Sequence, residues 1–192
     1  MRQAHSLRLG TILAVSAAIA LVLGTAASAG LIFQDTFHDE GTFVLEDFCD
    51  VPGLTIDGAF TVDGRVQATP HGPSGLAYFI EHLRSTTVLT NPETGLSTTE
   101  VVTVLQKDQR VTDNGDGTLT ILELGTGNDV VYGPDGKAIA RNPGQIRFEL
   151  LVDDSGTPTD PSDDVFLADL GTVKGSTGRN DDFCEAVVPA LT

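Results

Sequence analysis

The sequence of 192 residues contains no tryptophan, only two tyrosines, two cysteines, and 11 basic residues against 27 acidic ones. With tyrosine only at Tyr78 and Tyr132, a carbohydrate-binding module built on an aromatic platform is disfavoured. The shortage of lysine and arginine disfavours binding to nucleic acid or to anionic membranes, because both depend on cationic side chains. A solvated extracellular surface, a calcium site or a basic partner remains compatible with this charge.

The motifs of several enzyme classes are also missing. The sequence has no Gly-x-Ser-x-Gly nucleophile elbow and no Walker spacing for phosphate. His38, His71 and His82 stand far apart, whereas a zinc site usually takes two closely spaced ligands. His82 would serve as a general base only if it faced the interior, and a surface histidine is the plainer interpretation. The sequence therefore assigns no catalytic residue.

The first 29 residues have the pattern of a secretory signal peptide. Arg2 and Arg8 precede an apolar run over residues 9–23, and Ala27-Ser28-Ala29 has the small residues of a cleavage site. The run is shorter than the roughly 20 residues of a membrane span. We therefore expect a secreted, extracellular protein with no transmembrane segment after cleavage, and a single domain over residues 30–192. This leader holds two of the 11 basic residues and no acid, so nine basic residues face 27 acidic ones in the mature chain.

The two cysteines stand in matching surroundings near opposite ends of the mature chain, in Asp47-Phe48-Cys49 and Asp182-Phe183-Cys184. Export exposes them to an oxidising compartment, so a disulfide between Cys49 and Cys184 is expected. Two buried free thiols are the alternative. A metal pair is disfavoured because no histidine lies near either cysteine.

Short segments with a period of two fill the chain from residue 54 to residue 170. The alternation of Ile146, Phe148, Leu150 and Val152 is the clearest of them. Asp63-Gly64 predicts a hairpin turn, and further turns are predicted at residues 91–95, 113–117, 133–136 and 142–144. No window has a helical stripe. The pattern predicts an all-β antiparallel meander closed as a small β-barrel, or alternatively a β-sandwich. The meander follows a loosely structured lead-in over residues 30–53, which we expect to be part strand.

Several of these segments resemble stretches of uncharacterised secreted actinobacterial proteins. The resembling stretches are residues 46–49, 75–79, 113–118, 132–136, 142–144, 156–160 and 175–179. The resemblance covers most of the mature chain. It implies secretion and a single domain, and it carries no activity.

A cluster of acids precedes the last predicted strand. Its members are Asp153, Asp154, Asp160, Asp163 and Asp164. Clustered carboxylates in a bent loop are typical calcium ligands, although the spacing does not match an EF-hand. The alternative is a soluble loop that uses aspartate and proline for their turn conformations. No other cofactor is indicated.

The block over residues 76–80 is apolar on both faces of its strand. It predicts either a barrel interior that holds an apolar ligand or the central strand of a packed core. Three functions stay open: a non-enzymatic β-domain that binds a small apolar ligand or a protein, a barrel enzyme of the isomerase or cyclase type, and a calcium-stabilised structural or adhesion module.

Overall fold

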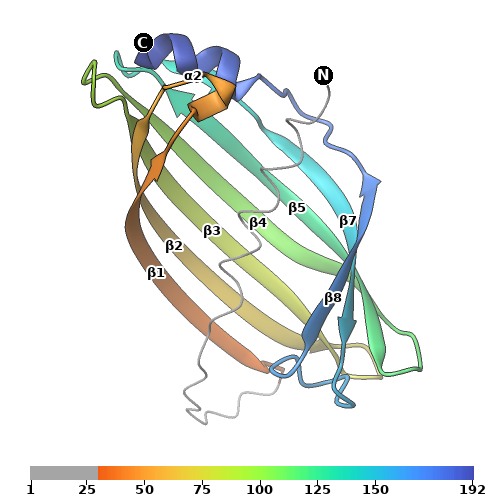
Figure 1. The fold of residues 1–192 in the computed structure, drawn as a ribbon. Coiled ribbons are helices and arrows are strands. Elements are labelled where there is room, and N and C mark those ends of the chain that lie inside the picture. The colour runs from red at the N-terminus through yellow and green to blue at the C-terminus, as the bar shows by residue number, and fades with distance from the viewer. Residues whose placement is uncertain (1–29) are drawn as a thin grey trace.

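The computed structural model describes residues 30–192, which form one sheet of eight strands, a short 3-10 helix and one α-helix (Figure 1). The strands are β1 (Phe33–Leu45), β2 (Ile56–His71), β3 (Leu76–Thr90), β4 (Ser97–Asp113), β5 (Thr118–Tyr132), β6 (Ala138–Arg141), β7 (Gly144–Asp153) and β8 (Val165–Lys174). The 3-10 helix η1 spans Phe48–Asp50 and the α-helix α2 spans Phe183–Leu191. The predicted signal peptide lies outside the described residues. No helix between residues 30 and 192 is long and apolar enough to cross a membrane.

The sheet is antiparallel throughout and follows the chain. Its order is β1-β2-β3-β4-β5-β7-β8, and the short β6 pairs with β5. The predicted all-β antiparallel meander is therefore confirmed. The predicted turns near residues 91–95, 113–117, 133–136 and 142–144 each separate two strands.

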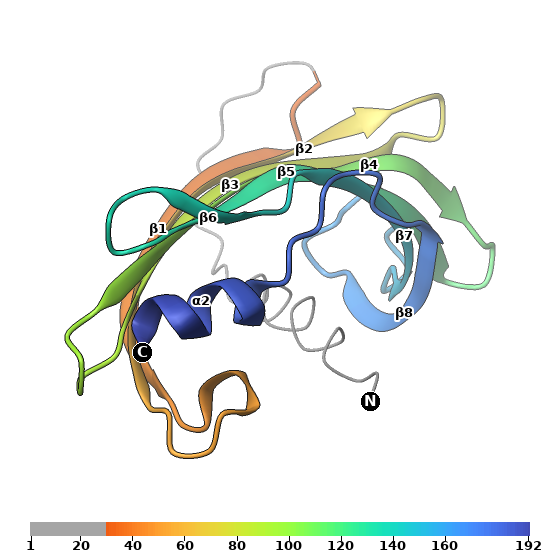
Figure 2. The ribbon, with the colours of Figure 1, turned by 90° about the horizontal axis from the view of Figure 1, so that it is seen from above.

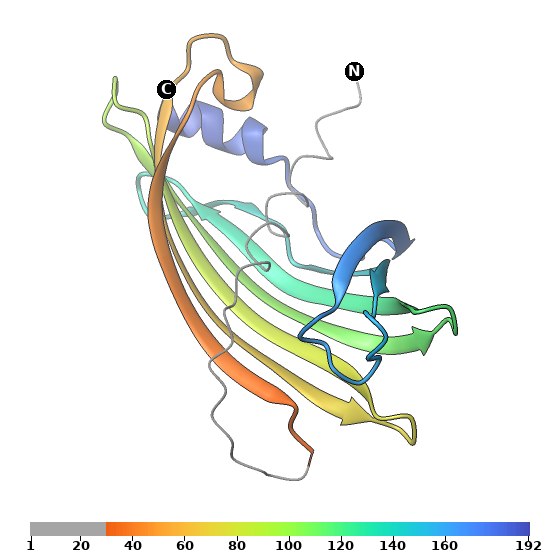
Figure 3. The ribbon, with the colours of Figure 1, turned by 60° about the horizontal axis from the view of Figure 1, so that its bottom comes forward.

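The sheet is open, so the predicted closed barrel is wrong, and the alternative sandwich is not supported because the described strands form one sheet. Figure 3 shows β1 and β8 as its two edges, on opposite sides of a concave face. Turn residues specify which neighbours in the chain pair, whereas closure depends on the tilt and stagger of the whole sheet. The local patterns therefore predicted the meander but not its closure.

The predicted lead-in, which was expected to be part strand, contains β1, and this strand pairs with β2 from Phe33–Ala68 to Leu45–Ile56. One local prediction is also wrong, because the Asp63-Gly64 pair lies inside β2 and makes no turn. A glycine inside a strand often marks the close approach of another group, and here the ring of Phe37 covers Gly64.

Phenylalanine–glycine pairs hold β1 against β2. The ring of Phe37 covers Gly64, that of Phe43 covers Gly58, and that of Phe60 covers Gly41, each directly across the ladder. A Cβ atom added at any of these glycines would overlap the ring. Aromatic rings on opposed glycines stabilise a strand at the edge of a sheet.

Replacing Gly64 with alanine is expected to lower the free energy of unfolding by about 1–3 kcal/mol, because the new methyl group overpacks the Phe37 ring. Urea denaturation measures the change. Gly175→Ala is the matched control, since nothing lies within 4 Å of a Cβ atom there. Equal effects of the two substitutions would contradict a role for the ring.

The helix α2 lies across one end of the concave face (Figure 2). Its fully buried Val187 and Leu191 belong to a core cluster with Ile56, Leu89 and Val131 of the sheet. Asp182 caps the helix by accepting a hydrogen bond of 3.0 Å from the backbone N–H of Glu185. At the other end, Asn91 and Thr94 of the β3–β4 turn donate to the carbonyl of Leu191.

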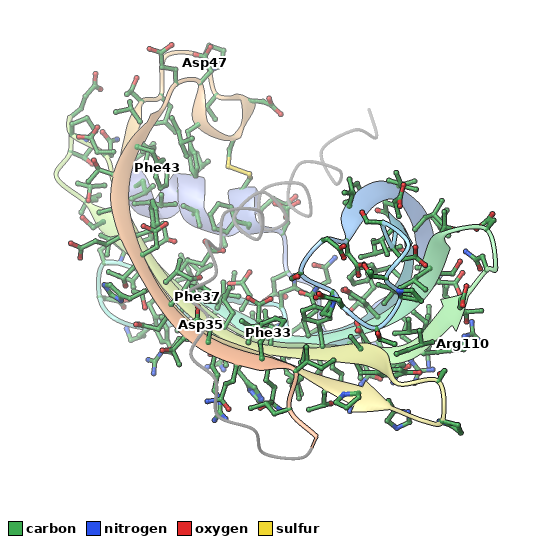
Figure 4. The ribbon with its side chains drawn as sticks, turned by 90° about the horizontal axis from the view of Figure 1, so that it is seen from below. Phe33, Asp35, Phe37, Phe43, Asp47 and Arg110 are labelled. Carbon is green, nitrogen blue, oxygen red and sulfur yellow. A yellow bond between two sulfur atoms is a disulfide. The ribbon has the colours of Figure 1, made fainter. Side chains whose placement is uncertain are left out.

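The predicted disulfide is confirmed. It joins Cys49 of η1 to Cys184 of α2, with the two Cα atoms 5.6 Å apart (Figure 4). The rings of Phe48 and Phe183 meet edge to face beside it. The bond therefore fastens the segment after β1 to the helix that covers the core.

Candidate functional site

The middle of the concave face is the candidate site, because α2 covers only one end of it. The nine residues of α2 span about 14 Å, whereas a strand of 15 residues such as β3 extends for about 50 Å. A sheet normally buries one face against a second layer. Most of this concave face therefore extends beyond the helix.

Half-buried apolar side chains line this middle part. Phe37, Leu83 and Val104 share one row across the strands, in register with the glycines of β2 and β5 at positions 64 and 127. Because these glycines have no side chains, nothing projects from the sheet between the apolar residues of this row. Figure 4 shows Phe33, Phe37 and Phe43 on the concave side. The ring of Phe33 also meets that of Phe79 edge to face, with centroids 5.5 Å apart.

The charged side chains of the strands are divided between the two faces. Strand alternation and register place these acids on the concave face: Asp35, Asp39, Glu81, Glu100, Asp108, Glu123 and Asp129. The same register places these cations on the convex face: Arg65, Arg84, Lys107, Arg110 and Arg147. The concave face of strands β1–β5 is thus acidic and carries none of the lysines or arginines of those strands.

We call Glu81, Asp108, Glu123 and Asp164 the acidic row, because their carboxyls interact electrostatically. Asp108 and Glu123 form its centre. They lie directly opposite each other on β4 and β5, next to a bulge in β4 between Asp108 and Arg110. Gln106 donates to Oε2 of Glu123 at 2.5 Å, and the backbone N–H of Phe79 donates to Oδ2 of Asp108 at 2.8 Å. Carboxylates directly opposite each other on a sheet repel when both are ionised.

The pKa of Asp108 is raised to about 7, by burial first and then by the nearby carboxyls of Glu123 and Asp164, against the opposing hydrogen bond from Phe79. Burial also raises the pKa of Glu123 and of Glu81. The pKa of Asp164 rises to about 6, through burial first and then through its acidic neighbours. Near neutral pH this row therefore holds protonated carboxyls that donate hydrogen bonds and ionised ones that attract cations.

The predicted candidates outside this row are placed differently. His82 is exposed on the convex face, so the register removes it from the concave interior. His38 is exposed at the surface, where its Nδ1 atom forms a hydrogen bond of 2.8 Å with Oδ1 of Asp63. From the apolar block over residues 76–80, Phe79 faces the candidate site and Leu76 joins a second core cluster with Val111 and Leu119.

The five aspartates of the predicted calcium loop serve mainly as local acceptors. Asp153, Asp154 and Asp160 each accept from the backbone N–H two residues later, as expected of aspartates in turns. Asp163 accepts from the hydroxyl of Thr157, and Asp164 is half-buried. Among residues 30–192, no group of three or more His, Cys, Asp or Glu side chains is placed to hold a metal ion. Calcium binding by this loop stays a prediction.

A shallow groove of about 470 Å³ lies elsewhere, along β1, β2 and β3 near the α2 end. Its lining residues are Thr42, Phe43, Val44, Asp57, Gly58, Ala59, Val88 and Thr90. Asp57 is the one acidic or basic residue among these, so the groove offers no convergent set of charged groups. We therefore place the candidate site on the acidic concave face, where geometry and charge coincide.

Strict alternation along β4 holds as far as Asp108 and fails at the bulge that follows it. Before the bulge the even-numbered residues of β4 face the concave side, and after it the odd-numbered ones do.

Comparison with known proteins finds no matching family model, no matching curated protein and no matching solved structure.

Proposed function

We propose that this chain is an extracellular binding protein that holds a small, mainly apolar molecule bearing a cationic group against the concave face of its sheet. The observation that carries the proposal is the combination of half-buried apolar side chains and exclusively acidic strand charges on that face. The leader-like pattern of residues 1–29 and the disulfide support an extracellular location.

The apolar row supplies the affinity for the body of the ligand. Each methylene group that leaves water contributes about 0.8 kcal/mol, and Phe37, Leu83 and Val104 present half-buried carbon surface side by side. The rings of Phe33 on β1 and Phe79 on β3, which meet edge to face, extend this apolar surface beside the acids. A flexible alkyl chain or a flat ring system would fit such a face.

The acidic row selects the head group. A cation 4 Å from an ionised carboxylate gains about 4 kcal/mol at an effective dielectric constant of 20, part of which offsets desolvation. An anionic head would be repelled by the ionised carboxylates and would find no lysine or arginine on the concave face of strands β1–β5. The face therefore discriminates by charge more than by shape.

Isothermal titration calorimetry with three ten-carbon alkyl compounds tests this selectivity. The three carry a trimethylammonium, a sulfate or a neutral sugar head, each used below its micelle concentration. We expect the trimethylammonium compound to bind at least tenfold more tightly than the sulfate. Equal affinity for all three would refute the charge selection, and no binding by any would refute the proposed function.

Adjacent lysine substitutions on β4 provide a matched pair for locating the site. Val104→Lys places a cation on the concave face and should weaken binding of the trimethylammonium compound at least tenfold. Leu105→Lys places the same charge on the convex face, one residue away, and should leave the affinity within a factor of two. Equal weakening by both variants would place the ligand elsewhere.

A second function, acid–base catalysis on the bound molecule, is favoured by the opposed Asp108 and Glu123 carboxyls. A carboxyl with a pKa near neutrality is suited to transfer protons at physiological pH. An isomerase would lose turnover in Asp108→Asn while it retained ligand affinity. A pure binding protein would show no turnover in either form.

A further inference from the structure

The pairing of β3 with β4 ends well before the two strands do. The last paired residues are Ile80 and Lys107, although β3 begins at Leu76 and β4 continues to Asp113. Beyond this point the β2–β3 hairpin and the β4–β5 hairpin diverge (Figures 2 and 3). We call this region, residues 76–79 facing residues 108–113, the β3–β4 fork.

Two side chains bridge the fork where the ladder stops. The carboxylate of Asp108 accepts from the backbone N–H of Phe79 at 2.8 Å, and the hydroxyl of Tyr78 accepts from the backbone N–H of Val111 at 3.1 Å. Leu76 packs against Val111 between the two hairpins. The fork is thus closed by two hydrogen bonds and a small apolar contact.

We propose that the β3–β4 fork is a proton-operated hinge, which is closed while at least one of the Asp108 and Glu123 carboxyls is protonated and opens when both are ionised. Asp108 belongs to both parts of this device, since its carboxyl bridges the fork and also opposes Glu123 across the β4–β5 ladder. Loss of the last proton places two negative charges at one cross-strand position, and burial keeps both away from water. Although an ionised carboxylate is the better acceptor for the Phe79 N–H, opening of the fork separates the two charges and admits water to Asp108.

The charged groups that act on Asp108 are all acidic. Glu123 faces it from β5 and Asp164 from the segment before β8, and Glu81 of β3 acts on Glu123. In the same row, β2 presents Ala68 and β7 presents Phe148. The nearest arginine along β4, Arg110, is on the convex face and pairs with Glu149 at 3.0 Å. No cation of these strands therefore offsets the second negative charge.

Hydrogen–deuterium exchange of the native protein at pH 6 and pH 8 tests the hinge, after correction for the intrinsic pH dependence of amide exchange. We expect the protection of the Phe79 and Val111 amides to fall about tenfold between the two pH values. The amides of Ser85 and Val102, paired in the middle of β3 and β4, should keep their protection. The readout needs no ligand, so its result is independent of the proposed function.

Two neutral variants and one matched control complete the experiment. Asp108→Asn and Glu123→Gln each remove one of the opposed charges, so either one should abolish the pH response at Phe79 and Val111. Asp35→Asn, an exposed acid of the concave face on β1, should retain it. The hinge is overturned if wild-type protection is the same at both pH values, if Ser85 and Val102 lose protection equally, or if both neutral variants still respond.

Discussion

Replacement of both Cys49 and Cys184 with serine is expected to lower the free energy of unfolding by about 3–5 kcal/mol. The bond joins residues 135 positions apart, and the entropy of closing so long a loop in the unfolded chain corresponds to nearly 5 kcal/mol. Its loss also releases η1 from α2, the helix whose Val187 and Leu191 complete the core. The stabilisation therefore concerns the whole sheet and not only the chain ends.

Guanidinium denaturation with and without a reducing agent measures this contribution. The wild-type protein should lose stability on reduction, and the double serine variant should not respond. Cys49→Ser alone should leave one reactive thiol, at Cys184. A change below 1 kcal/mol, or two reactive thiols in the native wild-type protein, would contradict the role of the bond.

Asp108→Asn is expected to stabilise the protein by about 2–4 kcal/mol at pH 8. The folded structure raises the pKa of Asp108 from 3.8 to about 7, and about three pH units correspond to about 4 kcal/mol. Because the folded-state pKa is the higher one, the stability associated with the protonated carboxyl is complete below about pH 4. It is lost as the pH rises to about 7. Asparagine carries no charge and still accepts the hydrogen bond from Phe79.

Urea denaturation at pH 5 and pH 8 checks this prediction. The free energy of unfolding of the wild-type protein should fall between these pH values, and that of Asp108→Asn should fall much less. Asp57→Asn is the control, because Asp57 is exposed on the convex side, and it should change stability by less than about 0.5 kcal/mol. If Asp108→Asn were less stable than the wild-type protein at pH 8, the ionised Asp108 carboxylate would not destabilise the fold, and the prediction would be wrong.

Local patterns predicted the strands and most of the turns. Alternation of Ile146, Phe148, Leu150 and Val152 identified β7 with the correct buried face. The turn predicted at Asp63-Gly64 does not form, because this glycine accommodates the Phe37 ring from β1, a contact between residues 27 positions apart in the sequence. A contact between residues so far apart cannot be recognised from the sequence of a short segment.

The helix α2 was missed although it carries a start signal. Asp182 with Glu185 three residues later is a capping pattern, and the structure shows Asp182 in the capping role. The helix has only nine residues and contains Pro189, so its apolar stripe is too short to stand out. Its stability depends on packing against the sheet and on the disulfide beside it.

The acidic row of the concave face was not predictable from sequence periodicity. The bulge between Asp108 and Arg110 puts Asp108 and Val111 on one face, although their spacing in a regular strand would separate them. Glu81 and Glu123 join the row only through the register of three strands. The site is therefore a product of sheet register, which local patterns specify weakly.

Binding of the ten-carbon trimethylammonium compound, followed by NMR chemical shifts of the backbone amides, tests the central claim most directly. We predict shift changes that concentrate on the concave row, at Phe37, Leu83, Val104 and Gly127, and on its acidic neighbours Glu81 and Glu123. Saturable changes confined to this face would establish it as a ligand site for apolar cations. Changes centred on the shallow groove near the α2 end, at Val44, Ala59 and Val88, or no saturable change at all, would contradict the proposed function.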